Sequence, residues 1–321
     1  MSFIGSKGQL KTVNNDLIEV LKKRFEGEIF YRGTNGYDDA RSIWNGIIDN
    51  HPSLILKCKN IKDIKKAINF ARGNQIKVSI RGGGHNVAGN AIIQNGLVID
   101  LSEMNSVKID SKKRIAKIQA GATLGDIDKE TAKHNLVTPL GVVSQTGIAG
   151  LALRGGMGHL MKKFGLTCDN VVSYDIVTFD GKLRKVDAKH NSDLYWVLRG
   201  GGVDVGVITS FTMKLYPIKS KVLFIFQLFP AEQGKNALIF LRDYLKSASD
   251  ELGILGTYMT IPEDENFPES IWGKQVFAFF GVYTGSQKKW ESILESLKKF
   301  SEPLLDLGGP SKFVEIQKSL D

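Results

Sequence analysis

Cysteine and proline are both scarce in this chain, which has two cysteines and eight prolines among 321 residues. Cys58 and Cys168 lie far apart and form no Cys-x-x-Cys motif, which argues against a zinc cluster or a disulfide framework. Long apolar runs are also missing. The first ten residues have no signal-peptide core, and the longest uncharged stretch, Asn135 to Leu153, is interrupted by Pro139 and several glycines. We therefore expect a cytoplasmic protein without a membrane span or a metal site.

Acidic residues are outnumbered, 34 against 43 lysines and arginines, which leaves a formal net charge of +9. The lysines are spread over helical segments, for example at Lys62, Lys65 and Lys66, and do not form one basic patch. No nucleic-acid motif and no interleaving of aromatic and basic residues accompanies the charge. We expect a solvated surface and no nucleic-acid partner; an acidic small ligand is compatible with the charge but not required by it.

Glycine is abundant, at 34 residues, and it is concentrated in the middle of the chain. Six glycines fall between Gly141 and Gly158 alone. Because proline is scarce, this excess is not typical of linkers. It indicates backbone that approaches something closely or adopts positive φ.

The first hundred residues show a regular alternation of elements. Apolar residues at helical spacing predict a helix around residues 15–25, with capping candidates at Asn14 to Asp16 and a stop near Gly27. A strand at 53–57, a helix from residue 61 ended by Gly73, and a strand at 76–80 follow. This order is typical of a βαβ unit that delivers the next loop to one end of a sheet.

Shorter strands follow, and then a region with few glycines. We expect strands at 96–101, 107–110, 115–119, 171–179, 183–186 and 207–215, a helix at 124–134, and a hairpin turn at Asp180-Gly181. After Pro217 the pattern predicts strands at 222–229, 254–261 and 275–283 and helices at 235–248, 288–300 and 310–321. The change in composition predicts a domain boundary at residue 218, followed by a sheet covered by helices on one face.

Three glycine-rich loops are the candidate ligand-binding features. The first, Arg81-Gly82-Gly83-Gly84-His85-Asn86, follows a strand, and its backbone N–H groups could converge on an anion. The side chain of Arg81 could equally face the protein, and glycine runs also occur in plain turns. The loop matches neither a Walker motif nor a dinucleotide fingerprint.

The second loop is Thr146-Gly147-Ile148-Ala149-Gly150, followed by Arg154-Gly155-Gly156-Met157-Gly158. The third is Arg199-Gly200-Gly201-Gly202, continued by Gly206 and Val207 before a strand. Three such loops in one domain favour a long cofactor with a phosphate centre and a broad ring.

The order of these motifs resembles a known family. The likeness is carried by five motifs in this order: RGGGHN, Pro139-Leu-Gly141, TGIAGL-x-L-x-GG-x-G, FGLTCDNV and DLYW-x-LRGGG…GVITSF. With these motifs, the chain is similar to the FAD-binding (PCMH-type) domain of the vanillyl-alcohol oxidase superfamily. Within it, the likeness is greatest to the branch of berberine-bridge-enzyme-like and 6-hydroxynicotine-oxidase-like proteins, and it runs from about Trp44 to Pro217.

This resemblance implies an α+β protein. Residues 1–43 would be an N-terminal helical segment, and residues 44–218 a PCMH-type FAD-binding domain of two subdomains. Residues 219–321 would be a substrate domain, an antiparallel sheet with helices on one face. Relatives continue well past the point where this chain stops, so we expect this last domain to be truncated. An exposed edge and an open flavin ring would then favour self-association or poor solubility.

The resemblance also implies roles for single residues. Arg81, Gly82, Gly83, Gly84, His85 and Asn86 would wrap the FAD pyrophosphate, and His85 stands where many relatives bind the flavin covalently. Thr146, Gly147, Gly150, Gly155 and Gly156 would face the flavin ring and ribityl chain, and Gly206 and Val207 the adenine half. Some relatives have a second covalent link through a cysteine, but here Val142-Val143-Ser144 occupies that position. At most one covalent link, through His85, is expected, and Cys168 is expected to be buried packing.

Three positions depart from the family pattern. Arg154 stands where glycine is usual, His159 where an aromatic residue is frequent, and Asp204-Val205 where Asn-Phe is usual. Arg154 could place positive charge near the flavin N1–C2 region or point outward. His159 and Tyr283 are the candidates for a catalytic base if the short chain is active.

The resemblance implies an FAD-dependent oxidoreductase that removes a hydride from an alcohol- or amine-bearing carbon of a small molecule and passes the electrons to oxygen or another acceptor. The alternative is a flavin-binding protein, or a remnant, with little turnover. The substrate and the catalytic residues are not identified by the sequence.

Overall fold

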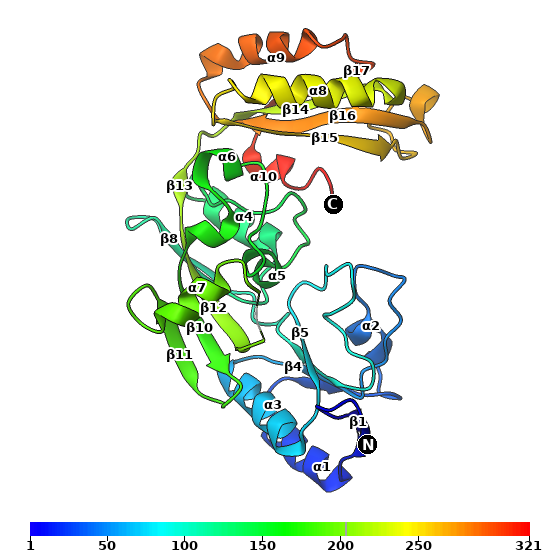
Figure 1. The fold of residues 1–321 in the computed structure, drawn as a ribbon, viewed down its shortest axis with the longest axis vertical. Coiled ribbons are helices and arrows are strands. Elements are labelled where there is room, and N and C mark those ends of the chain that lie inside the picture. Colours follow the sequence, from blue (N-terminus) through cyan, green and yellow to red (C-terminus); the bar gives the residue numbers. More distant parts are fainter. Residues whose placement is uncertain (203) are drawn as a thin grey trace.

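The computed structural model describes residues 1–202 and 204–321 and has three main sheets (Figure 1). We call residues 1–101 the first lobe. Its sheet has the order β3 (Glu28–Phe30), β4 (Leu54–Lys57), β6 (Leu97–Asp100) and β5 (Val78–Arg81). The strands β4 and β5 both run parallel to β6, which lies between them, and β3 is antiparallel to β4. The predicted βαβ unit is therefore present, with β6 inserted between its two strands.

The helices of the first lobe pack apolar faces into its core. They are α1 (Asn15–Arg24), α2 (Tyr37–Arg41) and α3 (Ile61–Asn74), and a small ribbon of β1 (Ser2–Ile4) and β2 (Leu10–Thr12) lies beside them. The Asn14 and Asn60 side chains cap α1 and α3 by accepting backbone N–H bonds. The helix α3 continues through Gly73 and ends where Gln75 adopts the left-handed conformation, so Gly73 does not end it as expected.

Residues 107–217, the second lobe, form an antiparallel sheet. Its order is β11 (Leu183–Asp187), β10 (Val171–Thr178), β12 (Gly206–Lys214), β8 (Ile115–Gln119) and β7 (Val107–Asp110). The hairpin predicted at Asp180-Gly181 joins β10 to β11 and is confirmed. The helices are α4 (Leu124–Ala132), α5 (Ile148–Ala152), α6 (Met161–Phe164) and α7 (Ser192–Leu198), and β9 (Leu136–Val137) pairs with β13 (Tyr216–Pro217). One continuous apolar core joins the two lobes.

Residues 222–316, the third lobe, form the sheet β15 (Leu252–Thr260), β16 (Gln275–Tyr283), β14 (Val222–Pro230) and β17 (Leu305–Asp306), with β18 (Gly309–Ser311) also paired to β14. The helices α8 (Gly234–Leu245) and α9 (Trp290–Lys298) cover its outer face, as Figure 1 shows, which confirms the expected one-sided cover.

The helix expected at 310–321 is largely absent. Only α10 (Phe313–Ile316) is helical there, and Pro310 lies in the edge strand β18. A proline has no N–H to donate within a helix or a central strand, and an edge strand is where it is tolerated. Within the described ranges, every helix is too short or too polar to cross a lipid bilayer.

Candidate functional site

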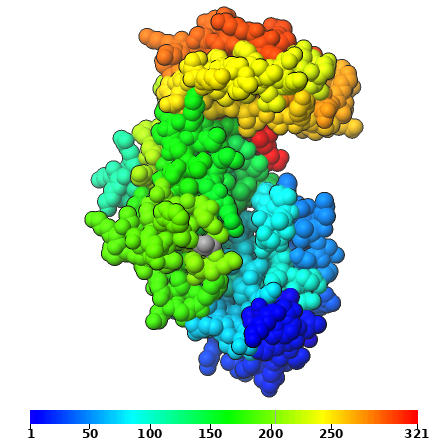
Figure 2. All heavy atoms as spheres, viewed as in Figure 1, coloured from blue at the N-terminus to red at the C-terminus, as the bar shows by residue number. Residues whose placement is uncertain are grey.

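A cavity of about 1420 Å³ lies between the first and second lobes. Its wall combines residues from β5, α3 and the following loop with residues of the α5 region and the start of β12. In Figure 2 the two lobes, coloured blue to cyan and green, meet along the face shown. Because pockets for drug-sized ligands are typically about 300–1,000 Å³, this space suits a larger ligand of dinucleotide size.

The loop after β5 forms one side of the cavity. Gly82, Gly83, Gly84, His85 and Asn86 all line it. In the part of the chain that the structure describes, the backbone N–H groups of residues 82–85 donate to no protein acceptor. Gly84 has φ +73°, which turns the chain back within this short loop. A run of free N–H groups around a turn can bind an anion.

The first and second glycine loops touch through their backbones. A Cβ placed on Gly83 would lie 2.4 Å from the backbone nitrogen of Gly147, and one placed on Gly147 would lie 2.3 Å from that of Gly83. No side chain fits at either position. The two glycines thus let the two halves of the cavity wall approach each other closely.

The structure brings eleven of the thirteen predicted site residues to this wall. Besides the five already named from the first loop, they are Thr146, Gly147, Gly150, Gly155, Gly156 and Gly206. The other two lie outside the wall. Arg81 turns its guanidinium toward the Ala40 carbonyl oxygen and lies 3.6 Å from the Asp100 carboxylate. Val207 is fully buried in the core.

His85 is half-buried and stacks on the indole of Trp44, with ring centroids 5.4 Å apart. Burial lowers the pKa of this imidazole below its ordinary value, and the negative charge of Asp321 opposes the shift. The ring is therefore neutral near pH 7 and keeps a nitrogen lone pair that can act as a nucleophile.

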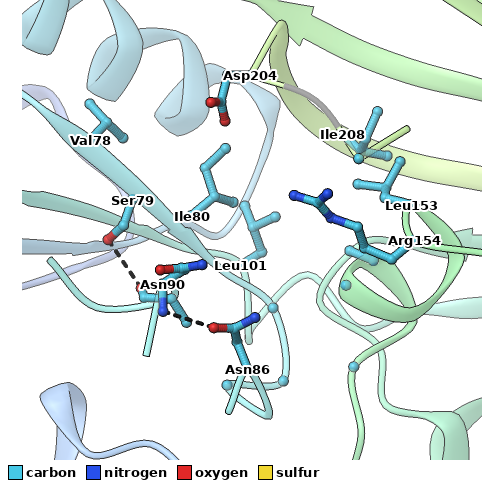
Figure 3. A pocket seen from close by; sticks show the side chains of 18 of the residues that line it. Val78, Ser79, Ile80, Asn86, Asn90, Leu101, Leu153, Arg154, Asp204 and Ile208 are labelled. Atoms are coloured by element: carbon cyan, nitrogen blue, oxygen red, sulfur yellow. Dashed lines mark hydrogen bonds between the residues drawn. The ribbon is translucent and has the colours of Figure 1, made fainter. Parts of the chain in front are cut away.

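Arg154 lines the cavity from the end of α5. In Figure 3 its guanidinium extends from the second lobe toward Ile80 and Leu101 of the first. A Cβ on Gly202 would lie 2.2 Å from Nε of Arg154, so the bare backbone of Gly202 makes room for the arginine. Of the two directions considered for Arg154, the structure shows the one that faces the cavity, where the side chain is exposed. Asp204 also lines the cavity.

Several wall residues were not identified from the sequence. Ser79 and Asn90, seen in Figure 3, flank the first loop: Ser79 donates to the Ala91 carbonyl oxygen and the Asn90 N–H donates to Asn86. Ser79 could have been identified from the sequence, because it lies in the strand directly before a glycine loop. Arg72 and Gln75, at the end of α3, also line the cavity and carry no motif signal.

Neither candidate base lies in the cavity wall. His159 is 5% exposed, packs 5.4 Å from the ring of Phe280, and its Nε2 atom has no partner in the described part of the chain. Burial lowers the pKa of His159 to about 4. Tyr283 is fully buried in the third lobe, where its hydroxyl donates to Glu251 over 3.4 Å. Among the described residues no cluster of His, Cys, Asp and Glu could hold a metal ion.

The residues present fit FAD. The cavity has the size for a dinucleotide, the free N–H groups of the first loop suit its pyrophosphate, and the Gly83–Gly147 contact keeps that part of the wall free of side chains. Apolar side chains such as Ile80, Leu151 and Ile208 supply surface for its rings.

Comparison with known proteins supports this assignment. The family model described as FAD binding domain matches residues 52–187. An FAD-linked oxidoreductase of Dictyostelium discoideum is 33% identical over 297 residues, which cover 92% of this chain and 62% of that protein. (R)-6-hydroxynicotine oxidase of Paenarthrobacter nicotinovorans is 37% identical over 198 residues, covering 62% of this chain and 43% of the relative.

Solved structures show the same fold. The crystal structure of 6-hydroxy-D-nicotine oxidase from Arthrobacter nicotinovorans superposes with a TM-score of 0.82 at 30% identity and covers 91% of this chain and 63% of its own. BBE-like 1 of Physcomitrella patens superposes with a TM-score of 0.83 at 20% identity, over 94% of this chain and 63% of that one. The chain spans less than two thirds of the length of these relatives. Residues 52–187 thus match an FAD-binding domain, and the chain is similar in sequence to FAD-linked oxidoreductases and shares the α+β fold of 6-hydroxy-D-nicotine oxidase and BBE-like 1.

Proposed function

We propose that this chain works as an FAD-dependent oxidoreductase that removes a hydride from a small-molecule carbon bearing an alcohol or amine. The observation that carries the proposal is the convergence of eleven predicted cofactor residues on one cavity of dinucleotide size. Bound FAD would supply the redox chemistry, accepting the hydride and passing electrons to oxygen or another acceptor. In this proposal residues 44–218 are the FAD-binding domain and residues 219–321 the substrate domain.

The residues of this chain would bind and orient the cofactor. The free N–H groups of residues 82–85 would hold the pyrophosphate, and the wall from Thr146 to Gly156 would exclude water from the ring. His85 would be the point of covalent attachment, because its neutral imidazole lines the cavity and is held by stacking on Trp44. Ser144 stands at the position of the second link of some relatives, and its hydroxyl bonds Asp321.

A visible absorption spectrum of the purified protein, before and after acid precipitation, tests this function. Flavin bands before precipitation would support FAD binding, and bands that stay with the pellet would support covalent attachment. A protein that remains colourless after incubation with FAD would contradict the proposal. Anaerobic reduction of the bound flavin by candidate alcohols and amines then tests hydride removal.

A flavin-binding protein with little turnover is the second candidate function. It is favoured by one observation: among the described residues, the cavity wall includes none beyond Ile208, so the third lobe contributes no side chain to it. In that case the spectrum would show flavin, but no alcohol or amine would reduce it faster than buffer alone.

A further inference from the structure

We propose that Arg154 is the positive counter-charge for the pyrophosphate of the bound cofactor, a role that the motif order would give to Arg81. The inference rests on the proposed function, because it needs FAD in this cavity. It concerns a residue for which the comparisons assign no role.

The first step is to account for each cationic side chain near the cavity. Arg81 belongs to the glycine loop, but its guanidinium is used inside the first lobe by the Ala40 carbonyl oxygen and the Asp100 carboxylate. Arg72 lines the cavity, and its guanidinium donates to Asn69 Oδ1 at 2.9 Å and to the Phe179 carbonyl oxygen at 3.4 Å.

Arg154 differs from both. Within residues 1–202 and 204–321 its guanidinium has no hydrogen bond and no ion pair, although it lies in the cavity wall. Figure 3 shows it extended across the cavity toward the first lobe. The lysines of this basic chain do not line the cavity in the described part. Arg154 is therefore the permanent positive charge left to meet an anionic ligand.

The position of Arg154 is built into the fold. The side chain leaves the end of α5 and passes over Gly202, where any Cβ would collide with Nε of the arginine. The helix α5 begins directly after Gly147, and Gly147 touches Gly83 of the first loop. The loop with the free N–H groups thus contacts the start of α5, and the guanidinium leaves the chain just after the other end of this helix.

The chemistry of FAD favours the pyrophosphate as the partner of Arg154. The pyrophosphate carries the permanent negative charges of FAD, whereas the oxidised flavin ring is neutral. A guanidinium binds phosphate oxygens through two parallel N–H donors and adds a full positive charge, which backbone N–H groups lack. Asp204 is the acidic side chain of the wall, and its charge opposes phosphate binding, which makes a compensating cation more important.

The test measures equilibrium binding of flavins to the apoprotein. Quenching of flavin fluorescence reports the binding, so the readout does not depend on catalytic activity. His85→Ala protein is used if wild-type flavin is covalent. FAD is compared with riboflavin, which has no phosphate, in wild type and in Arg154→Met. We expect Arg154→Met to weaken FAD binding about ten- to hundredfold, as for a lost charge-assisted hydrogen bond, and to leave riboflavin binding within about twofold.

Arg154→Lys should lose less than half as much FAD affinity as Arg154→Met, measured as log Kd, because it keeps the positive charge. Arg72→Met is the matched control: the same change in the same cavity, at a guanidinium that already has protein acceptors, should alter FAD binding less than about threefold. Raising the salt concentration should weaken FAD binding to wild type more than to Arg154→Met. Circular dichroism confirms that each variant is folded.

Equal losses for FAD and riboflavin would overturn the inference, since Arg154 would then act through the ring or through packing. Unchanged FAD binding in Arg154→Met would also overturn it. If wild-type apoprotein binds no FAD at all, the proposed function itself fails, which is a different result from either of these.

Discussion

The surroundings of His85 favour a neutral imidazole, which can act as a nucleophile, over a charged imidazolium. It is half-buried, stacked on Trp44 and shifted toward the neutral form. It makes no core contact on which the lobe depends, so its loss should be tolerated.

We predict that His85→Ala folds and still binds FAD, but releases all flavin into the supernatant on acid precipitation. The physical reason is that the N–H groups of residues 82–85 remain, while the only expected covalent link is lost. The measurement is flavin absorbance in pellet and supernatant, with Cys168→Ala as control because Cys168 is buried outside the wall. Flavin that stays with the His85→Ala pellet would place the link at another residue.

His159 gives the fold a dependence on acid. Its folded-state pKa of about 4 lies below the ordinary value of 6.5, so the unfolded chain binds a proton first as the pH falls. The free energy of unfolding is therefore unaffected by this group above pH 6.5 and decreases between pH 6.5 and 4, by up to about 3 kcal/mol.

We predict that His159→Phe, which keeps an aromatic contact with Phe280, removes this decrease. Urea unfolding of wild type and variant at pH 7, 5.5 and 4.5 measures it. The difference between the two proteins should shift in favour of the variant as the pH falls. A difference that does not change with pH would show that His159 is not neutral in the folded chain.

At the scale of elements, most boundaries followed from the sequence because the apolar periodicity is strong. The strand at 275–283 and the hairpin at 180–181 are as predicted. Two predicted boundaries were wrong for physical reasons. The helix α3 continues past Gly73 because its cap is Gln75, and residue 310 does not begin a helix because Pro310 lies in the edge strand β18, which pairs with β14. The glycine loops showed where the cavity wall lies. The direction of the Arg81 side chain could not be read from them, because it depends on Asp100, its neighbour on the adjacent strand β6.

The elements α4 and α10 are joined by a buried polar contact. Gln317, just after α10, donates from Nε2 to Asp128 Oδ2 at 3.2 Å and to the Gly141 carbonyl oxygen at 3.0 Å. Asp128 Oδ1 and Gln317 Oε1 have no partner in the described part of the chain. Burial raises the pKa of Asp128 to about 7, and the Gln317 hydrogen bond opposes the shift.

We predict that Asp128→Asn stabilises the protein at pH 7, because the amide can donate to Gln317 Oε1 and carries no charge. The unfolded chain releases the Asp128 proton near pH 3.8 and the folded chain near pH 7, so wild type loses up to about 4 kcal/mol between these values. Urea unfolding at pH 4 and pH 7 measures the effect: the gain in the variant should be largest at pH 7. A variant that is less stable at pH 7 would contradict this account.

For the whole molecule, the cavity lies between two lobes that one cofactor would bridge. A ligand that binds only the folded chain raises its free energy of unfolding by about 2.7 kcal/mol at a concentration one hundred times Kd. Both lobes share one core, so they should unfold together.

We predict that FAD at one hundred times Kd raises the Tm of apoprotein by about 4–6 °C, in one cooperative transition. Differential scanning fluorimetry with an extrinsic dye, or calorimetry, measures the shift, and riboflavin at equal concentration is the control for the missing phosphates. A separate early transition that FAD does not move would mean that the lobes unfold independently.

The backbone contact between Gly83 and Gly147 also limits how this protein can change over generations. Each position excludes a side chain because of the main chain of the other, so a harmful substitution at one cannot be rescued by shrinking its partner. Residues in contact often change together during evolution, but at these two positions only glycine fits, so neither position can change. In a saturation library selected for flavin retention, both sites should tolerate glycine alone, and no double variant should recover what a single one has lost.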